Sequence, residues 1–179
     1  MSSLPPLVQP AAELSNDEVA RYSRHLIIPD VGMDGQKRLK NAKVLVIGAG
    51  GLGSPTLLYL AAAGVGTIGI VEFDVVDESN LQRQVIHGES RLGMAKVRSV
   101  QIALAEINPF VAVEAVGARL DRVLADELVP QQHLVIDGCD NLETRHLLNA
   151  ACVRAGVPLL SAAISQWEGQ LSLYDPAGG

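Results

Sequence analysis

The residues that most clearly indicate a chemical function form a glycine-rich loop. Gly48, Gly50 and Gly53 are spaced as G-x-G-x-x-G between an apolar run and a predicted helix. Glycines at this spacing let the backbone approach a phosphate, and the helix N-terminus adds N–H donors and the positive end of a dipole. Glu72 ends the next predicted strand, where an acidic side chain would bind ribose hydroxyls. The sequence therefore predicts a nucleotide site.

The glycine spacing does not identify the nucleotide. By itself it would favour NAD, and a tight strand-to-helix turn without any ligand is the plain structural alternative. Gly51 makes a Gly-Gly pair inside the loop, which departs slightly from the NAD pattern.

Two cations follow the glycine loop. Arg83 lies in a polar segment with Asn80 and Gln84, and Lys96 stands at the start of a predicted helix. A cation there opposes the helix dipole, a placement that a bound anion would compensate. Taken singly, each could be an exposed surface charge. Beside a phosphate loop, we interpret them as two unpaired phosphate ligands.

A second polar segment, from Asp137 to Asn141, follows another apolar run. Asp140 stands where a carboxylate could hold Mg²⁺ against the phosphates of a nucleotide. Alternatively, Asp140 or Asn141 could cap the helix predicted from Leu142. Spacing alone leaves both interpretations open.

Alternating strands and helices must position these residues. Apolar runs predict strands over 43–47, 67–73, 111–116, 133–137, 159–162 and 170–174. Helical spacing and caps predict helices from residue 15, over 35–40 and 54–63, from 95 to 107, and over 122–128 and 142–155. This order predicts an α/β fold with a doubly wound, mostly parallel, Rossmann-like sheet and helices on both faces. Ligands bind at the carboxyl ends of the strands in such sheets.

Composition limits the class of protein. The formal net charge is −6 and no basic patch occurs, so nucleic acid is not an expected partner. The sequence has no unbroken run of about 18 apolar residues, so it predicts no membrane-spanning helix. The two cysteines, Cys139 and Cys152, lie in apolar surroundings and are expected to be buried and reduced, as in a cytoplasmic protein. We expect a mobile segment over 1–12 and one domain over 13–179.

The polar segments together resemble the ubiquitin-activating-enzyme superfamily, in its ThiF/MoeB-type branch of adenylyltransferases. The resemblance covers about residues 14–174. It rests on several matching segments: Arg21 to Arg24, Gly48 to Gly53, Asp74, Asn80 to Gln84, Gly93 to Lys96, and Asp137 to Asn141.

The resemblance implies an enzyme that uses ATP and Mg²⁺ to adenylate the C-terminal glycine carboxylate of a ubiquitin-like sulfur-carrier protein ending in Gly-Gly, releasing pyrophosphate. Such a step serves molybdenum cofactor, thiamine or related biosynthesis. The family's enzymes also bind Zn²⁺ through Cys-x-x-Cys pairs that would follow residue 174. We therefore expect a chain truncated at its C-terminal end and inactive alone, with Zn²⁺ only in the absent part.

The resemblance also implies roles for single residues. Gly51 would lie against the nucleotide and Glu72 would hold the ribose, although many relatives have Asp there. Asn80 and Arg83 would contact the phosphates, and Lys96 the α-phosphate.

Four further residues complete the implied site. Asp140 would hold Mg²⁺, with Asn141 nearby, and Asp74 would belong to the nucleotide site. Arg24 would reach the γ-phosphate from the partner subunit of a homodimer.

Two rival functions remain. An NAD-dependent oxidoreductase shares the fold and the glycines but gives no use to Arg83, Lys96 and Asp140. A non-catalytic nucleotide-binding or dimerisation fragment is the other rival. The histidines have no triad-like context and are expected to be structural or exposed: His25, His87, His133 and His146.

Overall fold

The computed structural model describes residues 6–10 and 13–176. The predicted mobile segment over 1–12 therefore lies partly outside the described residues. Among the residues described, no helix combines the length and the apolar character needed to cross a membrane.

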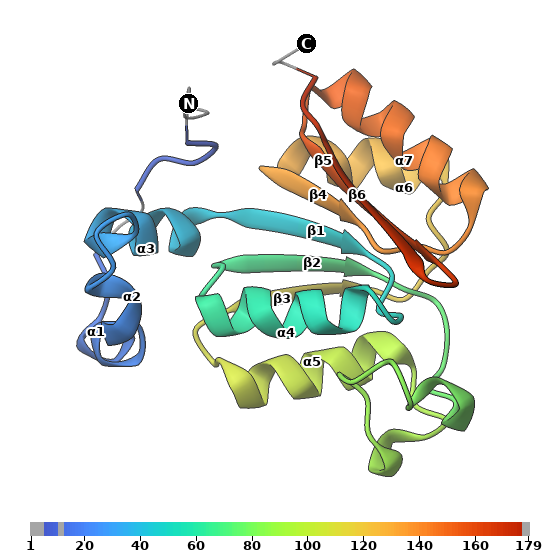
Figure 1. Ribbon diagram of the computed structural model, residues 1–179, viewed down its shortest axis with the longest axis horizontal. Helices are drawn as coiled ribbons and strands as arrows, with labels where there is room; N and C mark the ends of the chain where they lie inside the picture. The colour runs from blue at the N-terminus through green and yellow to red at the C-terminus, as the bar shows by residue number, and fades with distance from the viewer. Residues whose placement is uncertain (1–5, 11–12, 177–179) are drawn as a thin grey trace.

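Six strands form one sheet in the order β3-β2-β1-β4-β5-β6 (Figure 1). The strands are β1 (Lys43–Ile47), β2 (Thr67–Val71), β3 (Ala112–Val116), β4 (Leu134–Asp137), β5 (Leu159–Ser165) and β6 (Glu168–Tyr174). Strands β1 to β5 pair with one another in parallel register, and β6 pairs with β5 in antiparallel register. The predicted doubly wound α/β fold is confirmed.

Helices connect the strands. The α-helices are α1 (Asn16–Arg21), α2 (Ser23–Leu26), α3 (Gly32–Asn41), α4 (Gly53–Ala63), α5 (Lys96–Ile107), α6 (Arg122–Leu128) and α7 (Leu142–Ala155). Three short 3₁₀ helices are η1 (Glu78–Asn80), η2 (Glu89–Arg91) and η3 (Val129–Gln131). Helices α4 and α5 cover one face of the sheet, and α6 and α7 cover the other (Figure 1).

The two faces explain why β1 is apolar from Val44 to Ile47. Val44 and Val46 pack into the core under α4 and α5, whereas Leu45 and Ile47 pack into the core under α6 and α7. Successive side chains of a strand point to opposite faces, so a strand covered on both sides reads as an unbroken apolar run.

Local signals set the helix ends as predicted. Ser15 and Glu18 form the capping box at the start of α1. Helices α4 and α7 stop at Gly64 and Gly156, both in the left-handed conformation with φ of 84° and 67°, which glycine adopts without steric cost.

The last two strands are longer than predicted. The β5–β6 ladder extends to the pair Ser165–Glu168 around a turn at Gln166, a non-glycine residue with φ of 49°. Asn-Gly or Asp-Gly, the usual hairpin signal, is absent here, so the sequence did not reveal this turn. Every residue of β6 is exposed, including Leu171 and Leu173.

Helices α1 to α3 lie at the amino end of the sheet (Figure 1). Tyr22 packs beside Gly64 at the C-terminal end of α4, and its hydroxyl accepts a hydrogen bond of 2.8 Å from Asn108. The side chain of Asn108 also donates to the carbonyl of Ala61. These buried contacts fix the first helices at the end of α4 opposite the glycine loop.

Candidate nucleotide-binding site

The glycine loop and the loop after β4 meet at one point of the sheet. The Gly48 N–H donates to the Val71 carbonyl, and the Gly138 N–H donates to the Ile47 carbonyl, each at 3.0 Å. Gly48 has a φ of 90°, and a Cβ there would lie 3.1 Å from the Gly138 oxygen. Because β1 separates the two halves of the sheet, this is the switch point where doubly wound folds bind ligands.

Gly53 closes the loop. A Cβ at this position would lie 2.0 Å from the carbonyl oxygen of Gly48, a distance that no side chain tolerates. The loop then enters α4 directly, where the Ser54 N–H donates to the carbonyl of Gly50 at 2.9 Å. The first and last glycines of the motif thus touch each other, which explains their spacing.

Glu72 braces the glycine loop. One carboxylate oxygen accepts a hydrogen bond of 3.0 Å from the Ala49 N–H, and the other accepts from the N–H groups of Phe73 and Asp74 at 2.8 and 2.9 Å. The side chain is buried. The sequence did not reveal this bracing role, and ribose binding by Glu72 stays a prediction.

His87 holds the other side of the same peptide unit. Its Nε2 lies 3.2 Å from the Ala49 carbonyl oxygen and its Nδ1 lies 2.8 Å from the Ser99 hydroxyl. A carbonyl can only accept, so Nε2 carries the proton and Nδ1 accepts from Ser99. Burial lowers the pKa of His87 and keeps the ring neutral. His87 is therefore structural, as expected, and it supports the glycine loop through its hydrogen bond to Ala49.

Arg83 and Gln84 lie against the glycine loop. The Cδ of Arg83 would be 3.5 Å from a Cβ on Gly51, and the Nε2 of Gln84 would be 3.9 Å from one on Gly50. Arg83 is exposed and donates to the Ser79 carbonyl at 3.3 Å. Gln84 is buried, and its Oε1 has no hydrogen-bond partner among the described residues. Both side chains therefore lie next to the glycine loop, and their contact with a ligand stays a prediction.

Asn80 shapes the segment that carries Arg83. Its side chain donates to the Ser79 hydroxyl at 3.4 Å, and its carbonyl accepts from the N–H groups of Arg83 and Gln84 at 3.1 and 2.9 Å. Asn80 is half-buried beside them, so contact with phosphates stays a prediction.

Lys96 is not unpaired, contrary to the sequence-based interpretation. Its ammonium lies 3.3 Å from a carboxylate oxygen of Asp74, and its N–H donates to the Asp74 carbonyl at 2.9 Å. The side chain of Lys96 is 4% exposed, whereas that of Asp74 is 52% exposed. The acidic partner compensates a cation at the start of α5. The alternative that Lys96 is an exposed helix residue is also excluded.

Of the two residues that could cap α7, Asp140 and Asn141, it is Asn141 that does so. Its side-chain oxygen accepts from the Thr144 N–H at 2.8 Å at the start of α7. Asp140 is exposed and makes no hydrogen bond or ion pair with another described residue. The loop that carries Asp140 lies against the glycine loop through Gly138.

The lone carboxylate of Asp140 suits Mg²⁺ that is shared with substrate phosphates better than a metal ion bound by several protein side chains. Across the described residues, no group of three or more His, Cys, Asp and Glu side chains could hold an ion. Mg²⁺ is commonly bound by one or two carboxylates together with substrate phosphates. Asp140 fits that mode.

Arg24 does not reach the site of its own chain. It is an exposed residue of α2, and α2 follows Tyr22, which lies at the C-terminal end of α4. The glycine loop lies at the other end of that helix, about 16 Å away along its axis. Within one chain, Arg24 and the glycine loop are separate.

Both cysteines are free and buried, as predicted. Burial and the Asp137 carboxylate raise the pKa of Cys139 to about 12, and burial, with Asp137, raises the pKa of Cys152 to about 11. Because the thiolate is the nucleophile, neither residue is reactive at neutral pH.

We expect iodoacetamide at pH 8 to leave both thiols unmodified in the folded chain and to label both after unfolding in urea. Mass spectrometry would count the labels, and rapid native labelling of Cys139 would contradict its burial.

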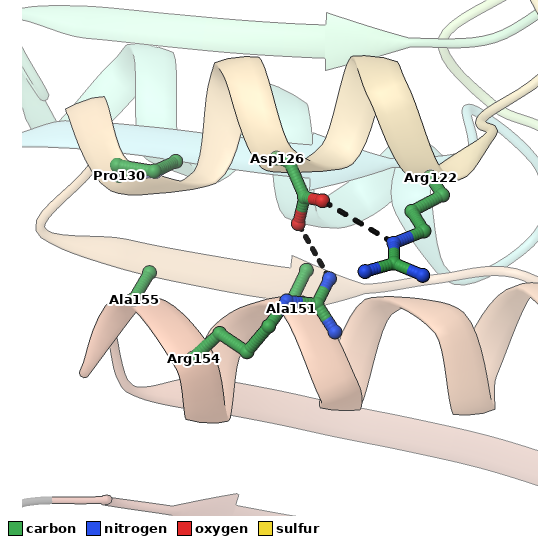
Figure 2. Close-up of a pocket in the computed structure, with 6 residues that line it drawn as sticks. All are labelled: Arg122, Asp126, Pro130, Ala151, Arg154 and Ala155. Atoms are coloured by element: carbon green, nitrogen blue, oxygen red, sulfur yellow. Dashed lines mark hydrogen bonds and ion pairs between the residues drawn. The ribbon is translucent and has the colours of Figure 1, made fainter.

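A cavity of about 310 Å³ lies elsewhere, between α6 and α7. Figure 2 shows Asp126 between the guanidinium groups of Arg122 and Arg154, with both of which it forms ion pairs. The rest of the lining is Pro130, Ala151 and Ala155. Its charged groups are thus already paired, and we assign this cavity no part in the chemistry.

A family model and curated proteins both match this chain, and they point to the same family. The family model of the ThiF family matches residues 22–179. Among curated proteins, the probable adenylyltransferase/sulfurtransferase MoeZ of Mycobacterium tuberculosis is 62% identical over 173 residues, which cover 97% of this chain and 44% of MoeZ. The adenylyltransferase and sulfurtransferase MOCS3 of Mus musculus is 50% identical over 98% of this chain and 38% of MOCS3. The chain thus spans less than half the length of these relatives.

Solved structures show the same fold. The crystal structure of E. coli MccB with ATP has a TM-score of 0.78 and 28% identity, covering 87% of this chain and 48% of MccB.

Proposed function

The chain belongs to the ThiF family, and we propose that it forms the nucleotide-binding part of an adenylyltransferase that activates the C-terminal glycine carboxylate of a ubiquitin-like sulfur carrier. The homology to MoeZ and MOCS3 supports this assignment. The observation that supports it most directly is that Arg83 and the loop after β4, through Gly138, both lie against the glycine loop at the switch point, with buried Lys96 at the start of α5.

The reaction must bring two anions together. A carboxylate attacks the α-phosphorus of ATP and pyrophosphate leaves, so negative charge grows on the phosphate oxygens. Arg83 over the glycine loop and Lys96 would oppose that charge, which is the main source of catalysis in such transfers. A carboxylate is already ionised at neutral pH and needs no general base. The structural role of His87 agrees with this.

The loop supplies the binding half of the task. Its backbone, braced by Glu72 and His87, would hold the phosphates without reorganisation, and the N-terminus of α4 favours their charge. Asp140 would hold Mg²⁺, which neutralises phosphate charge when bound. Neighbouring Asn141 keeps the start of α7 in place.

The rival oxidoreductase can be separated by ligand binding. A ligand that binds only the folded state raises the unfolding temperature. We expect ATP with Mg²⁺ to protect this chain against thermal unfolding and NAD to protect it far less. Protection by NAD alone would overturn the proposal, because it would leave Arg83, Lys96 and Asp140 without a role.

Asp140 provides a sharper test of the metal. Asp140→Asn should raise, by about tenfold or more, the Mg²⁺ concentration at which ATP gives half-maximal protection. Even the loss of a group that only orients a metal ligand lowers metal affinity by about that factor. The unfolding temperature without ligand should not change, because Asn141 caps α7. Asp121→Asn, the same change at the cap of α6, is the matched control and should behave as wild type. An unshifted Mg²⁺ titration in Asp140→Asn would contradict the metal role.

Arg24 motivates a further part of the proposal. Because it lies far from the site of its own chain, it can serve catalysis only from a second subunit. We propose a homodimer in which Arg24 of each subunit reaches the γ-phosphate end of the other site.

A further inference from the structure

We propose that Arg145 is a positioning residue, which fixes the 138–141 loop so that Asp140 faces the nucleotide. The inference rests on the proposed function, since it assumes that Asp140 holds Mg²⁺. It is drawn from a buried ionic network that the reaction itself does not use.

The network centres on Asp137, whose side chain is fully buried. One carboxylate oxygen accepts from the backbone N–H of Cys139 at 3.0 Å and from its thiol at 2.7 Å. The other accepts from the Ser161 hydroxyl at 2.9 Å and pairs with the Nε of Arg145 at 3.0 Å. A buried carboxylate needs such partners to offset its desolvation.

Arg145 joins three parts of the chain. Besides Asp137 at the end of β4, its Nη2 donates to the carbonyls of Cys139 and Ala162, each at 3.0 Å. These acceptors belong to the end of β4, the loop after it, and β5. The guanidinium therefore ties the loop to a neighbouring strand from one turn inside α7.

Asp140 depends on that anchoring because its own side chain makes no hydrogen bond or ion pair with another described residue. Asp140 lies between two residues that are held in place. On one side, Cys139 is hydrogen-bonded to Asp137 and Arg145. On the other side, Asn141 caps α7. A Gly138 peptide packed against Gly48 and Gly53 sets the other side of the loop. The network thus determines where the free carboxylate of Asp140 stands.

The geometry requires arginine. Its planar fork reaches several acceptors at once in fixed directions, whereas lysine is a flexible point charge. Arg145→Lys keeps a cation beside Asp137 and should preserve the fold. Arg145→Ala would leave a buried charge unpaired and is a less informative variant.

The test measures the Mg²⁺ dependence of thermal protection by ATP for wild type, Arg145→Lys, Asp140→Asn and the double variant. We expect Arg145→Lys to raise the Mg²⁺ midpoint severalfold, with ligand-free unfolding temperature close to wild type. If Arg145 acts through Asp140, the double variant should be no worse than Asp140→Asn alone. Arg122→Lys, which alters an exposed ion pair in the α6–α7 cavity, is the matched control and should show the wild-type midpoint.

The outcomes separate the two claims. A wild-type midpoint in Arg145→Lys, or effects that add in the double variant, would overturn the positioning role. A wild-type midpoint in Asp140→Asn, or no Mg²⁺-dependent protection in the wild type, would instead overturn the metal site on which the inference rests.

Discussion

Lys96→Ala and Arg83→Ala should each lower the rate of carrier adenylation about a hundredfold or more in an active enzyme that contains this domain. Removing one charge from a preorganised site costs about 3 kcal/mol of activation free energy in comparable systems. The rate of carrier-dependent ATP–pyrophosphate exchange measures the loss directly.

Neither substitution should unfold the protein. Arg83 is exposed, and the partner that Lys96→Ala leaves behind, Asp74, is half-exposed and can be hydrated. We expect unfolding free energies within about 1 kcal/mol of wild type. Arg98→Ala removes an exposed cation from the same helix, α5, and should retain full activity. Wild-type exchange rates in the Lys96 and Arg83 variants would refute their assignment as phosphate ligands.

Gly53→Ala should be the most damaging single-methyl substitution in the loop. The added carbon would lie 2.0 Å from the Gly48 carbonyl oxygen, and backbone atoms cannot move aside as a flexible side chain can. Forcing extra volume into a packed site costs about 1–3 kcal/mol, and the shifted loop should also lose ATP-dependent protection. Urea unfolding and the thermal-protection assay would measure the two effects.

Gly51→Ala is the matched control for Gly53→Ala. A Cβ there would meet the Arg83 side chain at 3.5 Å, an ordinary contact. This variant should keep wild-type stability but bind ATP more weakly if the nucleotide lies against Gly51. Equal stability of the two variants would show that the close approach of Gly53 to Gly48 is not a constraint on the fold.

Much of this structure could be predicted because its signals are local. The apolar run of β1, the capping box at Ser15 and the stop at Gly64 each depend on residues adjacent in the sequence. Their order then determines the sheet, since strands that alternate with helices pair in parallel. The glycine motif could therefore be placed in advance at the carboxyl end of β1.

The remaining features depend on contacts between distant residues. The pairing of Lys96 with Asp74 and the bracing of Ala49 by Glu72 and His87 join separate loops, and no spacing rule encodes them. The choice between Asp140 and Asn141 as cap was ambiguous for another reason. Both residue types cap helices well, so only the backbone geometry could decide.

The central claim is that the carboxylate of a carrier attacks ATP at this site. The most direct measurement is ATP–pyrophosphate exchange by an active enzyme that contains this domain, with a carrier ending in Gly-Gly compared with the same carrier ending in a C-terminal amide. We predict exchange with the carboxylate form and none with the amide, which lacks the attacking oxygen. Equal exchange with both forms, or exchange without any carrier, would contradict the account.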